Sequence, residues 1–164
     1  AAYALFGLSV LVVLFLTDVR HFLIPDRIML PAIGVAAAVA ALNTFVFRCE
    51  LPGIPCSMFS ALSSLSGAAF FLTLVVVSGG RGMGLGDVKL AVFMGLFLGF
   101  PKLIVALLMA FFSGSIVGGM LILLGKKGLK SEVPFGAFLA PATAVSFFWG
   151  EAMLRYAHLL PFRW

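Results

Sequence analysis

Two aspartates stand out because each lies at the end of an apolar run. Asp18 follows the first run of the chain, and Asp87 opens a later run after a glycine-dense stretch at residues 78–86. Charged groups in membrane-embedded elements are costly, so their presence favours a functional role. Two carboxylates held close together resist double ionisation and share one proton. The ionised member can take a proton from water while the protonated member polarises a carbonyl group, which is the chemistry of aspartic peptide hydrolysis.

The glycines before Asp87 predict a turn that aims this carboxylate. Gly84 and Gly86 stand on either side of Leu85, directly before Asp87. Glycine adopts positive φ and allows close backbone approach where a side chain would clash. A tight connection between two helices with a polar cap uses the same residue types, so this second interpretation stays open.

The composition indicates an integral membrane protein. Of the 164 residues, 63% are hydrophobic and 10% are charged, whereas soluble domains carry about 25% charged residues. We therefore predict an all-α membrane protein with one transmembrane domain over residues 1–164. The net charge of +5 comes without a basic patch interleaved with aromatic residues, which argues against a nucleic-acid partner.

Six apolar runs predict a bundle of about six transmembrane helices. The runs cover residues 3–17, 28–47, 58–77, 88–100, 103–124 and 134–154. Asp18 then follows the first helix, and Asp87 lies at the start of the fourth. The fourth run is shorter than the roughly 17 residues that a span needs, so we expect this helix to be lengthened or tilted.

Counting crossings places both aspartates at the same membrane face. The second and third spans separate Asp18 from Asp87, and an even number of crossings returns the chain to one side. If all six runs cross, that side holds seven of the eleven basic residues, namely Arg20, Arg27, Arg81, Lys89, Lys126, Lys127 and Lys130. The side richer in Lys and Arg is cytoplasmic by the positive-inside rule, so we predict that both aspartates face the cytoplasm.

Lys89, Asp26 and His21 are the other polar residues near the predicted site. Lys89 either biases the titration of the aspartates, binds an acidic group of a substrate, or simply extends to the membrane interface. Asp26 competes with Asp18 for a catalytic role, but it follows Pro25 at a helix start, so we assign it a capping role. His21 has no second ligand at a metal-binding spacing, so we expect no metal site.

Three segments of the chain resemble the type IV prepilin peptidases, a branch of the GxGD intramembrane aspartyl proteases. The segments are Gly84-Leu85-Gly86-Asp87 with Lys89, Leu90, Gly95 and Gly99 after it, residues 18–27 with Leu30-Pro31 after them, and residues 132–140. They occur in the family's order and span most of the chain. The resemblance implies an aspartic endopeptidase with Asp18 and Asp87 as its catalytic residues and no cofactor.

The resemblance also implies a substrate and a location. The enzyme would cleave type IV prepilins or the pseudopilins of type II secretion after a Gly that ends a short basic leader, at the cytoplasmic face of the bacterial inner membrane. The apolar helix of the substrate would dock between spans, within the lipid bilayer. Pro134, Phe135 and Gly136 would help to shape the substrate groove, and a Glu of the substrate would meet Lys89 or Arg20.

The two cysteines, Cys49 and Cys56, flank a short loop that the six-span topology places outside the cytoplasm. Either a disulfide joins them, or Pro52 and Pro55 hold the two thiols in a geometry that forbids it. Many bacterial members of the family carry a further domain with paired CxxC motifs, which this sequence does not contain. We therefore expect a fragment or a short family member, with N-methyltransferase activity only if such a domain exists.

Other classes of function stay open. A small bundle with buried acids can act as a proton-coupled transporter, although these acids lie at span ends and no transporter-like internal repeat occurs. A scaffold protein of a secretion system would not need Asp87. A related leader peptidase would keep the chemistry and act on preflagellin-type substrates.

Overall fold

The computed structural model describes residues 2–21, 25–47, 50–51, 54–79, 84–124 and 135–156. The elements in chain order are α1 Ala2–His21, α2 Asp26–Phe47, β1 Glu50–Leu51, β2 Ile54–Pro55, α3 Cys56–Val77, α4 Leu85–Leu98, α5 Lys102–Leu123 and α6 Gly136–Tyr156. The predicted all-helical bundle is confirmed. The sequence did not predict the small antiparallel hairpin of β1 and β2, which joins α2 to α3.

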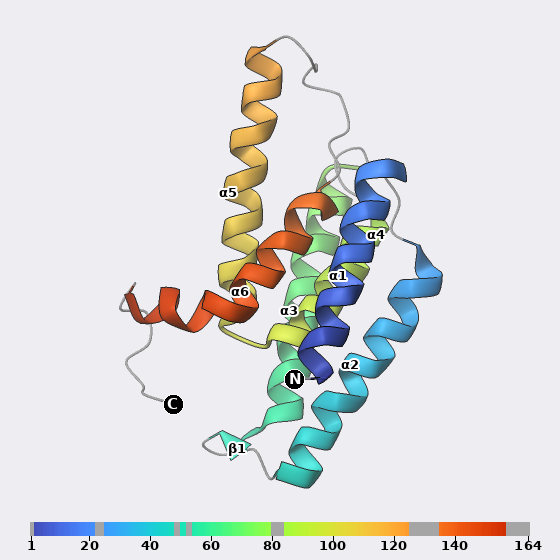
Figure 1. Ribbon diagram of the computed structural model, residues 1–164, viewed down its shortest axis with the longest axis vertical. Coiled ribbons are helices and arrows are strands. Elements are labelled where there is room, and N and C mark those ends of the chain that lie inside the picture. Colours follow the sequence, from blue (N-terminus) through green and yellow to red (C-terminus); the bar gives the residue numbers. More distant parts are fainter. Residues whose placement is uncertain are drawn as a thin grey trace.

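The short helix α4 lies at the centre of the bundle (Figure 1). It packs against α2, α3 and α6, and half of its 14 residues are buried. Because protein surrounds much of it, its length need not match the hydrocarbon thickness of a bilayer. Of the two expected adjustments, lengthening does not occur, because the short apolar run remains a helix of 14 residues, and tilting stays a prediction.

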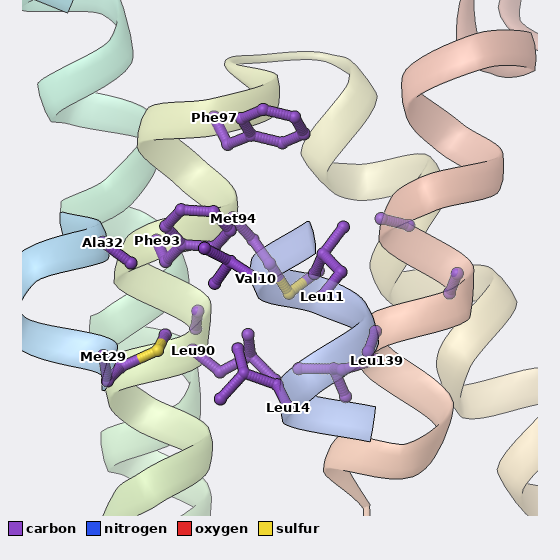
Figure 2. Packing of buried hydrophobic residues seen from close by; sticks show 14 of the residues in the cluster. Val10, Leu11, Leu14, Met29, Ala32, Leu90, Phe93, Met94, Phe97 and Leu139 are labelled. Atoms are coloured by element: carbon purple, nitrogen blue, oxygen red, sulfur yellow. The ribbon is translucent and has the colours of Figure 1, made fainter. Parts of the chain in front are cut away.

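Side chains from all five other helices contribute to the apolar core around α4, and Figure 2 labels those from α1, α2 and α6. Leu14 of α1 and Leu139 of α6 lie next to each other beside α4, where Leu90 points toward Leu14, and Met29 extends from α2 toward α4. All four side chains are buried. This packing fixes where α4 begins within the bundle and the direction in which the helix runs.

Gly95 brings α4 into close contact with α3. A Cβ atom added at Gly95 would lie 2.3 Å from the Cα atom of Ser64, a separation that real Cβ atoms do not reach. Small residues allow this kind of close approach between membrane helices. Gly99 then ends α4 with a positive φ of 67°, which glycine adopts without strain.

The outer surface of the bundle is suited to lipid. Among the described residues, four helical stretches are long and apolar enough to cross a membrane, namely Ala2–Arg20, Met58–Val77, Lys102–Leu121 and Gly136–Tyr156. Large apolar side chains cover the outside of α3 and α5, where Leu65, Val76, Leu108 and Phe112 are 64–72% exposed. A soluble monomer rarely exposes so much contiguous apolar surface, so the chain is a multi-pass membrane protein.

Candidate active site

Three helix ends meet at one end of the bundle and bring the two aspartates together. The helix α1 ends there with Asp18 in its last turn, and α4 and α6 begin there (Figure 1). Asp87 lies in the first turn of α4. The exposed fractions of Asp18 and Asp87 are only 5% and 7%. The structure thus places both carboxylates at the same end of the bundle, beneath its surface.

Asp18 is held by the N-terminus of α6. The backbone N–H of Ala137 donates a hydrogen bond to Oδ2 of Asp18 at 2.7 Å. Ala137 is the second residue of α6, and the N–H groups of a first helical turn have no partner within their own helix. The N-terminus of a helix also carries a partial positive charge. This contact therefore stabilises the ionised form of Asp18.

Asp87 is held by the N-terminus of its own helix. Its backbone N–H donates to the carbonyl oxygen of Gly84 at 3.2 Å, and the N–H of Gly84 donates to the Asp87 carboxyl group. An acidic side chain that reaches back to the residue before the helix forms half of a capping box. The contact fixes the direction of the Asp87 side chain.

Gly84 does not use the conformational freedom for which the sequence analysis singled it out. Its φ of −88° and ψ of 160° are extended values that any residue adopts. The nearest atom to an added Cβ at Gly84 would be the Gly86 nitrogen at 3.8 Å, which is an ordinary contact. Gly86 lies inside the first turn of α4. Asp87 is therefore held at Gly84 by an extended helix cap rather than by a backbone of positive φ.

The two carboxylates act on each other through space. The Asp18 and Asp87 side chains are close enough for a repulsive electrostatic interaction. Both are buried, so solvent screens this repulsion poorly. Each carboxylate faces a helix N-terminus, which compensates part of the buried negative charge. Such an arrangement favours one shared proton over two ionised groups.

Asp26 and Lys89 form an ion pair beside the aspartates. The distance from Lys89 Nζ to Asp26 Oδ1 is 2.5 Å. Asp26 is the first residue of α2 rather than its cap, because the carbonyl oxygen of Pro25 accepts the N–H groups of Ile28 and Met29. The Lys89 side chain thus has a partner on another helix, and its predicted place at the membrane interface stays a prediction. The sequence offered no signal for this pairing, because 63 residues separate the partners.

Phe135 anchors the start of α6. Its ring packs against Phe111 of α5, with centroids 4.8 Å apart, and against Phe71 of α3, with centroids 6.0 Å apart. Phe71 is fully buried. The ring thus fixes the helix end that donates to Asp18, a positioning role that the sequence analysis did not predict.

Several predicted residues lie outside what the structure describes. They are Pro134, Cys49 and the glycine-rich residues 80–83, together with the side chains of Cys56 and His21. The proposed disulfide is among these untested predictions. Within the described ranges, no group of three or more His, Cys, Asp or Glu residues is arranged to hold a metal ion.

A helical membrane bundle with two buried, interacting aspartates at one end defines a candidate membrane-embedded aspartic hydrolase. Comparison with protein families gives a more specific assignment. The model of the type IV leader peptidase family matches residues 5–119, a range that contains both aspartates. The chain belongs to the type IV leader peptidase family, so the resemblance drawn from the three sequence segments is confirmed.

Curated relatives extend the match along nearly the whole chain. The chain is 33% identical to a prepilin leader peptidase/N-methyltransferase of Aeromonas hydrophila over 147 residues, which cover 90% of this chain and 49% of the relative. Proteins of the same name from Xanthomonas campestris pv. campestris and Legionella pneumophila are 28% and 27% identical, over 87% and 94% of this chain and 49% and 52% of their own lengths. The chain therefore spans about half the length of the curated relatives it matches. No solved structure matches it.

Proposed function

We propose that this chain is a prepilin leader peptidase domain that hydrolyses a peptide bond with Asp18 and Asp87. One observation carries the proposal: in a member of the type IV leader peptidase family, α1 and α4 bring two buried carboxylates to the same end of the bundle, where they repel each other. Buried and interacting carboxylates are the arrangement that aspartic proteases use. We further propose that residues 1–164 act as a single peptidase domain.

The proposed reaction uses the carboxylates as one unit that carries a single proton. The ionised aspartate removes a proton from a water molecule, whose oxygen attacks the carbonyl carbon of the scissile bond. The protonated aspartate donates its proton to the carbonyl oxygen. The tetrahedral intermediate then collapses: the C–N bond breaks, the leaving amine takes a proton from the pair, and one hydroxyl group of the intermediate returns its proton to the pair, which restores the single shared proton. Titration belongs to the pair rather than to either residue.

Two backbone N–H groups beside the aspartates have roles that suit this reaction. The Ala137 N–H and the positive end of α6 stabilise negative charge on Asp18. The Gly84 N–H holds Asp87 in place within the first turn of α4. Both contacts are present before substrate binds, so neither has to form during the reaction.

We propose that the aspartates face the cytoplasm and act on type IV prepilins or pseudopilins. The positive-inside count over six spans supports this orientation. The substrate's basic leader would lie at this face and its apolar helix in the bilayer, with cleavage after a Gly. Lys89 is engaged by Asp26, so the exposed Arg20 is the better candidate to meet an acidic group of the substrate. The proposal covers the peptidase reaction only, whereas the longer curated relatives are also named as N-methyltransferases.

The test is cleavage of a purified prepilin by the purified chain in detergent. Asp18→Asn and Asp87→Asn should each abolish cleavage. The matched control is Glu151→Gln, which makes the same carboxyl-to-amide change in an exposed ion pair on α6 with Lys102 of α5 and should cleave at the wild-type rate. Cleavage that survives Asp87→Asn would refute the proposal. Proton flux in proteoliposomes that is lost with Asp18→Asn would instead favour a transporter.

The choice of substrate is tested in the same assay. A prepilin, a pseudopilin and a preflagellin are compared at equal concentration. Faster cleavage of the preflagellin would assign the chain to a related leader peptidase with the same chemistry.

A further inference from the structure

We propose that the Asp26–Lys89 ion pair is a positioning device that sets the rotation of α4 and thereby the direction of Asp87. The inference rests on the proposed function, because it assigns a role to two residues that flank the same site. It differs from the three roles that the sequence suggested for Lys89, which were a bias on the titration of the aspartates, binding of an acidic group of the substrate, and an extension to the membrane interface.

The start of α4 needs such a device because the cap and the first residue of the helix are exposed. Gly84 is exposed and has no close neighbour around the position of a Cβ atom. Leu85, the first residue of α4, is also exposed. A glycine leaves the backbone free to pivot. Contacts from other helices must therefore decide how α4 is rotated at this end.

Helix geometry couples Lys89 to Asp87. Successive residues of an α-helix are separated by about 100° around the axis, so the two side chains leave α4 on nearly opposite sides. Lys89 reaches α2, where it binds Asp26, while Asp87 interacts with Asp18 of α1. A rotation of α4 that moves Lys89 away from α2 also turns Asp87 relative to Asp18.

The ion pair acts together with an apolar contact on the same side of α4. Met29 is three residues after Asp26 and so lies on the same face of α2. Its side chain extends from α2 toward α4 (Figure 2). Met29 is fully buried. This apolar contact holds α2 against α4 but is not directional, whereas the ion pair at its edge fixes one rotation.

The solvent exposure of the Asp26–Lys89 pair distinguishes a role in positioning Asp87 from a role in overall stability. The side chains of Lys89 and Asp26 are 36% and 57% exposed. Ion pairs with this exposure contribute little to the free energy of unfolding because solvent screens them. Catalysis, in contrast, is sensitive to small displacements of a reacting group. Loss of the pair should therefore lower the turnover rate while the protein stays folded.

Steady-state kinetics on a purified prepilin provides the first test. Asp26→Asn and Lys89→Gln should each lower kcat about fivefold, the factor that corresponds to about 1 kcal/mol for an exposed ion pair, and should leave KM and the unfolding temperature unchanged. The double variant should be no slower than the slower single variant, because both changes break the same contact. The conservative variants Asp26→Glu and Lys89→Arg should keep most of kcat. A raised KM for Lys89→Gln alone, or an unchanged kcat in both single variants, would overturn the inference.

A second measurement tests positioning without any activity. In a chain with Cys49→Ser and Cys56→Ser, the variant Asp87→Cys reports the exposure of position 87 through its rate of alkylation by a maleimide. Lys89→Gln should raise this rate several-fold, and Lys89→Arg should not. An equal rate in all three backgrounds would overturn the inference even if the chain cleaved no prepilin. In contrast, wild-type failure to cleave would count against the proposed function alone.

Discussion

Gly95→Ala tests whether α4 is held in place by its close contact with α3. The new Cβ atom would lie 2.3 Å from the Ser64 Cα and 2.5 Å from the Ser64 nitrogen. Both are backbone atoms and cannot rotate away, so the helices must separate until the contact exceeds 3.0 Å. Overpacking of this kind costs about 1–3 kcal/mol, and the better helix propensity of alanine recovers at most about 1 kcal/mol.

The net loss of up to about 3 kcal/mol should lower the apparent unfolding temperature in detergent by several degrees. The displacement of α4 should also misplace Asp87 and lower kcat by about tenfold or more. Thermal unfolding and prepilin cleavage measure the two effects on the same preparation.

Gly118→Ala is the matched control, because a Cβ atom at Gly118 meets nothing within 4 Å. This variant should unfold at or slightly above the wild-type temperature, as expected from helix propensity alone. If Gly95→Ala behaved like Gly118→Ala in both assays, the close α3–α4 packing would not be what positions Asp87, and this reasoning would be refuted.

Three further predictions concern the start of α6 and the ion pair of Glu151. Ala137→Pro removes the N–H that binds Asp18 in a first helical turn, where proline is tolerated best. Its kcat should fall about 10–100-fold, as expected for a lost charge-assisted hydrogen bond, whereas Ala137→Ser keeps the N–H and should stay active. Phe135→Ala empties the aromatic contact at the start of α6 and should cost about 3–5 kcal/mol of stability in thermal unfolding, whereas the exposed Phe148→Ala should cost far less. Glu151→Gln breaks the Lys102–Glu151 ion pair and should change the unfolding free energy by less than about 1 kcal/mol, because the Glu151 side chain is mostly exposed.

The helical bundle and the common end of the two aspartates were accessible from the sequence. Apolar runs report membrane helices directly, because a helix in lipid satisfies its own backbone hydrogen bonds. The even number of predicted membrane crossings between Asp18 and Asp87 then places both residues at the same membrane face. This count needs no knowledge of packing. The family followed from three short segments whose residues and order are specific.

The supporting contacts were not accessible, because they depend on tertiary packing. The donor to Asp18 is the backbone N–H of Ala137, which is 119 residues away. Because nearly every residue type carries this group, the sequence cannot indicate which one binds Asp18. The Asp26–Lys89 pair likewise joins helices that are remote in sequence. The short length of α4 suggested a lengthened or tilted span because its central, protein-covered position cannot be deduced from hydropathy. Glycine composition alone also does not distinguish the extended helix cap at Gly84 from a residue of positive φ.

The most direct test of the central claim compares initial rates of prepilin cleavage by the wild-type chain, Asp18→Asn, Asp87→Asn and Glu151→Gln at one enzyme concentration in detergent. The account predicts that each of the two aspartate variants loses about 10³-fold or more of the rate, as expected for groups that act as one unit, and that Glu151→Gln matches the wild type. Cleavage by Asp18→Asn or Asp87→Asn at a rate close to that of Glu151→Gln would contradict it.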